Sequence, residues 1–147
     1  GLVGSEMCIR DRRKGIAMGP VNWLAVVLAA ALAVVGGFVW NGPPFQDGRR
    51  LSPGKSTLAG NYGLVCFVFL ISSIMLGHNF ARIGAETLAV KPWLYFMQTG
   101  GVAIAFVIPA VWLTHVRNRM EPLRRVMDCL FWLTAYLAMG LVFWALS

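Results

Sequence analysis

The sequence predicts an all-α fold, a transmembrane bundle of four helices in which sequential helices run antiparallel. Four intervals carry no charged residue: 15–46, 56–81, 92–116 and 129–147. Each is long enough to cross a membrane, because roughly 20 residues at 1.5 Å per residue span a ~30 Å hydrocarbon core. Hydrophobic residues make up 58% of the chain and charged residues 13%, against about 45–50% and about 25% in soluble domains. Short connections favour antiparallel neighbours within one domain, residues 18–147.

The first helix is expected over residues 21–40. Asn22 is a candidate N-cap, and Gly42-Pro43-Pro44 would end the helix. The second helix is expected over residues 58–78. It is able to continue to Ile83, where Gly84 provides a natural stop.

The third helix is expected over residues 93–115, after a proline suited to a first helical turn. Pro109 lies inside it and leaves the Ala105 carbonyl without its helical donor, which predicts a kink. The fourth helix is expected over residues 126–146. Tryptophans gather near the predicted helix ends, where amphipathic rings sit at headgroup level: Trp23, Trp40, Trp93, Trp112 and Trp144. Trp132 is the exception, because it lies inside the fourth span.

Residues 1–17 do not follow this pattern, and we expect them to be a non-native or disordered tail. Residues 5–12, Ser5-Glu6-Met7-Cys8-Ile9-Arg10-Asp11-Arg12, resemble a translated sequencing adapter. The native start would then be Met18. The alternative is the basic n-region of a signal peptide, but the apolar run that follows is long and has no convincing cleavage site.

Lysine and arginine counts in the short connections predict the orientation. Connections 41–57 and 116–125 together carry seven basic residues: Arg49, Arg50, Lys55, Arg117, Arg119, Arg124 and Arg125. The connection between the second and third helices carries Arg82 and Lys91. We therefore expect a multi-pass protein of the bacterial cytoplasmic membrane with loops 41–57 and 116–125 in the cytoplasm. If the basic tail were native, the counts would no longer decide.

Asp128 is the one charged residue expected within a span, and such residues indicate function. Arg124 and Arg125 precede it on the same helical face, and an acid in a first helical turn is favoured by the helix dipole. An ion pair with these arginines is therefore one interpretation. The other is a proton relay with His115, because the hairpin places the two side chains within roughly 3 Å of the same depth.

Uncharged polar residues predict a layer on the outer side of the midplane: Ser72, Ser73, Gln98, Thr99 and Tyr136. A buried hydroxyl or amide in hydrocarbon needs a partner. The layer either joins the helices through hydrogen bonds or lines a small outward-facing cavity. Tyr136 shares one stripe of the fourth helix with Asp128, Trp132 and Gly140.

Small residues repeat every four positions on three of the helices and allow close backbone approach. They are Ala29, Ala33 and Gly37, then Ser73, Gly77 and Ala81, then Gly101 and Ala105. The pattern suits packing within the chain and also association with a second copy.

Other chemistries have no support in the sequence. His78 and His115 lie at opposite membrane faces, and Cys66 and Cys129 have no metal-ligand spacing, so neither metal nor cofactor is expected. Gly54-Lys55-Ser56-Thr57 resembles the end of a phosphate-binding loop but lacks its first glycine, which excludes a nucleotide. The net charge of +7 is better explained by topology and lipid headgroups than by nucleic acid.

Several short motifs are similar to those of one membrane family. Asn22-Trp23-Leu24-Ala25 resembles its start, and Trp40-Asn41-Gly42-Pro43-Pro44-Phe45 the exit of its first helix. Asn118-Arg119-Met120-Glu121-Pro122-Leu123-Arg124, Asp128, Met139-Gly140 and Trp144 complete the resemblance. Over roughly residues 18–147 the chain resembles the bacterial family of domain of unknown function 1761. The resemblance implies a four-helix integral membrane protein and no catalytic residue.

The sequence thus favours an accessory or structural membrane protein without catalytic activity, bound to lipid and to a second copy or another membrane protein. The alternative is a small transporter or channel subunit that uses the polar layer. A membrane enzyme would need His115 and Asp128 to converge on one cleft.

Overall fold

The computed structural model describes residues 19–40 and 58–147. In those residues it contains helices and no strand, and four of the helical stretches are long and apolar enough to cross a membrane. The predicted all-α four-helix fold is confirmed. The helices are α2 (Trp23–Trp40), α3 (Leu58–Ile83), α4 (Ala85–Val90), α5 (Trp93–Val102), the π-helical η2 (Ala103–Val107), α6 (Ile108–Arg117) and α7 (Pro122–Ala145). The tail 1–17 and the whole of loop 41–57, with Arg49, Arg50 and Lys55, lie outside the described residues.

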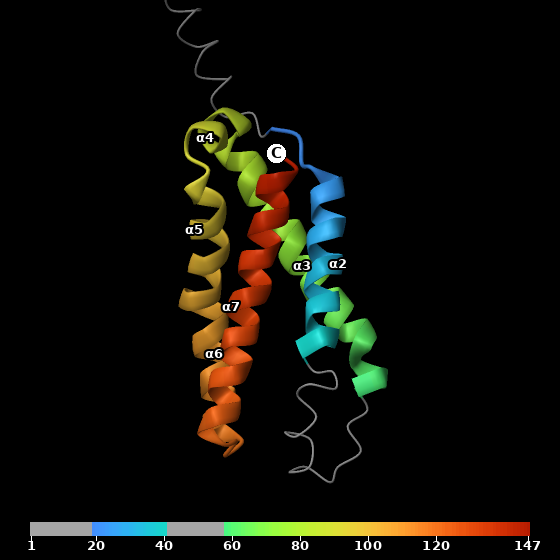
Figure 1. Cartoon of the computed structure of the whole chain (residues 1–147), viewed down its shortest axis with the longest axis vertical. Helices are drawn as coiled ribbons and strands as arrows, with labels where there is room; N and C mark the ends of the chain where they lie inside the picture. The colour runs from blue at the N-terminus through green and yellow to red at the C-terminus, as the bar shows by residue number, and fades with distance from the viewer. Residues whose placement is uncertain (1–18, 41–57) are drawn as a thin grey trace, which may run out of the picture.

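Helix α7 lies at the centre of the bundle (Figure 1), with α2 on one side and α5 and α6 on the other. Helix α3 packs on α2 and crosses behind α7 at a steep angle. The short helix α4 caps the end of the bundle at which the chain terminates. The turn from α6 to α7 lies at the opposite end, where α2 also ends (Figure 1).

Local sequence signals explain the helix boundaries. Asn22 caps α2 as predicted, because its Oδ1 accepts the Ala25 N–H at 3.1 Å. Its Nδ2 also donates to the Leu146 carbonyl at 2.9 Å, so one side chain joins the start of α2 to the end of α7. Gly84, with φ of 93°, ends α3 where the sequence placed the stop. Helix α7 begins at Pro122 rather than at residue 126, because proline suits the first helical position.

Two of the three small-residue ridges pack within the chain. Ala29 and Ala33 are fully buried on α2, and Gly37 meets the Phe131 ring of α7. On α3, a Cβ at Gly77 would lie 2.7 Å from the Val26 side chain. These glycines let the backbones approach, as small residues do at membrane helix interfaces.

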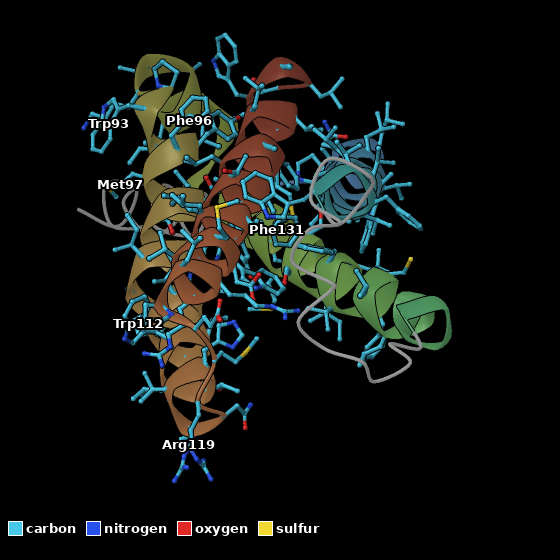
Figure 2. All side chains as sticks on the ribbon, turned by 60° about the horizontal axis from the view of Figure 1, so that its bottom comes forward. Trp93, Phe96, Met97, Trp112, Arg119 and Phe131 are labelled. Carbon is cyan, nitrogen blue, oxygen red and sulfur yellow. The ribbon has the colours of Figure 1, made fainter. Side chains whose placement is uncertain are left out.

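The third small-residue ridge, Gly101 and Ala105, lies on the surface of the bundle and does not pack against another of the described helices. Gly101 and Ala105 are exposed, and a Cβ at Gly101 would meet nothing within 4 Å. Several large apolar side chains of the same span also face outward, and Trp93 and Met97 project from the outer side of α5 (Figure 2). This face of the span is therefore open to lipid or to another protein.

Candidate functional site

His115 and Asp128 meet across the turn between α6 and α7. The imidazole Nε2 and the carboxylate Oδ2 are 2.7 Å apart, which is a short, charge-assisted contact. The side chain of His115 is 16% exposed and that of Asp128 is 35% exposed. The His115 Nδ1 is buried and has no hydrogen-bond partner in the described part of the chain. The structure therefore brings together the two groups that the proton-relay interpretation required.

The turn itself holds His115 in place. Helix α6 ends in a Schellman motif, in which Met120 N–H donates to the His115 carbonyl at 3.0 Å and Arg119 N–H to the Val116 carbonyl at 3.1 Å. Arg119 occupies the left-handed position of this motif, with φ of 52°, and projects from the tip of the turn (Figure 2). Two backbone hydrogen bonds thus tie the residues around His115 to the start of α7.

The π-helical segment η2 determines which way His115 faces. In an uninterrupted α-helix, at about 100° per residue, His115 would point about 120° away from the buried face of Ala103. The Ile108 N–H donates to the Ala103 carbonyl, five residues earlier, so the π turn contains one extra residue. The angle between His115 and the buried face of Ala103 is thereby reduced to about 20°. The disturbance predicted from Pro109 therefore takes the form of a π turn that directs His115 at α7.

A groove of about 260 Å³ lies between α6 and α7 beside the pair. Its lining combines apolar and polar side chains: Ala110, Val111, Thr114, His115, Asp128 and Trp132. The Thr114 hydroxyl donates to the Ala110 carbonyl at 2.8 Å. The Trp132 ring packs against Phe69 with centroids 5.2 Å apart. This contact explains why the tryptophan lies inside a span rather than at its end.

The comparisons with known proteins agree with this architecture. The sequence profile of a family described as "Protein of unknown function (DUF1761)" matches residues 24–144. The chain belongs to this family. No curated protein and no solved structure matches the chain.

The predicted ion pair of Asp128 with Arg124 or Arg125 is wrong for this DUF1761 member. Within the described residues the Asp128 carboxylate contacts His115, and no arginine lies within 4 Å of it. Arg125 instead donates from Nε to the Met120 carbonyl at 2.8 Å and lies 6.0 Å from the Trp112 ring centroid. Because α7 starts at Pro122, Asp128 also lies beyond the first turn, where the dipole argument no longer applies.

The predicted polar layer is present in this DUF1761 chain as a set of internal hydrogen bonds. Ser73 and Thr99 have no exposed surface. Ser73 Oγ donates to the Val26 carbonyl at 2.7 Å, and Thr99 Oγ1 to the Tyr95 carbonyl at 2.9 Å. The Tyr136 hydroxyl donates to Ser72 Oγ at 3.1 Å. Gln98 is half-buried, and no residue of the layer lines the groove beside His115.

The remaining candidate groups stay apart. Among the described residues no three His, Cys, Asp or Glu side chains come close enough to hold a metal ion. His78 contacts the Ile74 carbonyl of its own helix through Nδ1 at 2.9 Å and the Trp23 ring. Cys66 is exposed and Cys129 is buried, both as free thiols.

Sequence reasoning missed the walls of the groove. Val111 lies four residues before His115, so helical spacing places both on one face. The sequence did not indicate that Thr114 and Ala110 line a groove, because the π turn rotates the end of the third span about its axis and so decides which residues face α7. Trp132 gave a signal as the tryptophan outside the interfacial pattern, and on α7 it lies one turn after Asp128.

Proposed function

We propose that this DUF1761 member is an accessory protein of the bacterial cytoplasmic membrane, which binds a partner or ligand and neither catalyses a reaction nor conducts ions on its own. The proposal rests on the predicted polar layer, whose buried hydroxyl groups are hydrogen-bonded inside the chain. Ser73 and Thr99 have no exposed surface and are hydrogen-bonded to backbone carbonyls. A transport path through a single chain would need such groups to face water.

The geometry of the His115–Asp128 pair supports the absence of catalysis. In a His–carboxylate dyad that acts as a general base, one ring nitrogen holds the carboxylate and the other faces the substrate. Here that other nitrogen, Nδ1 of His115, is buried. The Thr114 hydroxyl, which lines the same groove, already donates its hydrogen to the Ala110 carbonyl.

The exposed apolar face of η2 and α6 supports association with a partner. Ile104, Phe106 and Leu113 are each more than 60% exposed. For orientation, we propose that loops 41–57 and 116–125 face the cytoplasm, because their basic residues would lie against anionic headgroups. Reporter fusions at residue 120 and at residue 87 should report opposite sides of the membrane.

Cysteine labelling in proteoliposomes tests the proposal. In a background with Cys8, Cys66 and Cys129 replaced by serine, a membrane-impermeant maleimide applied to both sides should leave Ser73→Cys unmodified. The matched control Thr114→Cys, which lies in the open groove, should react. The same vesicles should show no protein-dependent proton or potassium flux.

The alternative function predicts the opposite results. Labelling of Ser73→Cys together with ion flux would replace the accessory role by that of a transporter or channel subunit. Chemical crosslinking in native membranes is the second test. Recovery of monomers alone would contradict a role that depends on a partner protein.

A further inference from the structure

We propose that the groove between α6 and α7 binds a primary alkylammonium ion, with Asp128 as the acceptor of its hydrogen bonds and Trp132 as its aromatic wall. The inference rests on the proposed function and deepens it, because it gives the ligand class of the binding site. It follows from what the groove residues offer to a guest.

Asp128 provides a carboxylate with unused acceptor capacity. Its Oδ2 contacts His115, whereas its Oδ1 has no hydrogen-bond partner among the described side chains and backbone groups. An ionised carboxylate accepts about four hydrogen bonds. A charged side chain close to the hydrocarbon is costly unless such bonds are made. The 35% exposure of the Asp128 side chain leaves it accessible to a donor that enters the groove.

The groove offers acceptors in the oxygens of Asp128 and Thr114, and the side-chain donor that has no partner there among the described residues is the indole N–H of Trp132. The Thr114 hydroxyl donates its hydrogen bond to the Ala110 carbonyl, so its oxygen can only accept a further hydrogen bond. The Nε2 of His115 already contacts Asp128, and its Nδ1 is buried, so the imidazole presents no free nitrogen to the groove. An ammonium group has three N–H donors and no acceptor, and it is therefore the complementary polar group.

No arginine neutralises the carboxylate. Arg124 is exposed, and the Arg125 guanidinium is engaged by the Met120 carbonyl and the Trp112 ring. The unpaired Oδ1 of the Asp128 carboxylate favours a guest that carries N–H donors over an anionic guest. The exposed arginines of the turn oppose a cation, and salt screens their effect.

The other walls suit a short alkyl chain. Ala110 and Val111 are apolar, and the Trp132 ring is the best aromatic partner for a cation. The groove volume of about 260 Å³ corresponds to several water molecules at about 30 Å³ each. A linear alkylammonium of a few carbons fits within this volume.

Binding of n-butylammonium to the full chain in detergent micelles tests the inference, with n-butanol as the neutral probe of the same length. We expect saturable binding of the ammonium and no saturable binding of the alcohol. Asp128→Asn should weaken binding by about tenfold or more, equivalent to about 1.4 kcal/mol. Trp132→Leu should weaken it by a smaller factor.

Glu121→Gln is the matched control, because it removes one negative charge from the same turn outside the groove. It should leave the affinity within about twofold. Equal affinity of the wild type and Asp128→Asn, equal weakening by Glu121→Gln, or equal binding of n-butanol would each overturn the inference. If Asp128→Asn does not fold, the ¹³Cγ resonance of Asp128 in the wild type must shift on addition of n-butylammonium, and an unchanged resonance would overturn it. A failure here with Ser73→Cys still unlabelled would leave the accessory role intact.

Discussion

His115 and Asp128 lie thirteen residues apart in the chain and are joined by a 2.7 Å contact across the α6–α7 turn. The contact depends on a local feature, the Schellman motif at the end of α6, and on a distant one, the π turn at Ala103–Val107. The turn and the helical register that the π turn sets together bring the imidazole to the carboxylate.

Removing one member of this pair should cost more than removing both. His115→Leu leaves a carboxylate at the hydrocarbon edge without its partner and should lower the free energy of unfolding by about 1–3 kcal/mol. The double variant His115→Leu/Asp128→Leu should recover most of this loss, because both polar groups are then absent. Thermal unfolding in detergent of His115→Leu, Asp128→Leu and the double variant measures the coupling free energy between the two side chains. Additive losses would show that the contact contributes nothing to stability.

Gly140 should not tolerate a side chain. A Cβ at this position would lie 2.5 Å from Thr99 Oγ1 and 3.1 Å from Thr99 Cγ2. Gly140→Ala should therefore destabilise the packing of α5 on α7 by about 1–3 kcal/mol. The added variant Thr99→Ala should relieve the clash. Gly101→Ala is the control, because open space at Gly101 should make alanine neutral or stabilising by up to about 1 kcal/mol.

Asn22 should contribute to stability through two separate hydrogen bonds. Asn22→Ala removes the cap of α2 and the donor to Leu146, with an expected loss of about 1–2 kcal/mol. Asn22→Asp keeps the capping oxygen and loses only the donor, so its loss should be smaller. Equal losses in the two variants, measured by thermal unfolding, would contradict the capping role.

The π turn should absorb a deletion that an α-helix would not. Deletion of Ile104, whose side chain is 61% exposed, should convert η2 to α-helix and keep His115 facing α7. Deletion of Leu113, which is also exposed, should rotate His115 by about 100°. The His115 imidazole resonances should keep their hydrogen-bonded signature in the first variant and lose it in the second. Loss of the signature in both would show that the π turn is not interchangeable with one removed residue.

Much of the fold could be predicted from the sequence, because helix existence depends on local properties. Charge-free intervals, the capping side chain of Asn22 and the glycine at position 84 act over a few residues, and the structure places the helix ends there. The start of α7 at Pro122 was missed because a charged first turn does not appear in an apolar pattern.

The sequence by itself determined that this protein is a bundle of four apolar helices with a polar layer and one acid near a membrane edge. Hydrophobic length and residue spacing suffice for that. Only the tertiary structure decided that Asp128 meets His115 rather than an arginine, and that Ser73 and Thr99 are closed off by backbone carbonyls. These outcomes depend on how each helix is rotated about its axis. A single extra residue in a π turn changes that rotation by about 100°, and helical periodicity alone does not reveal it.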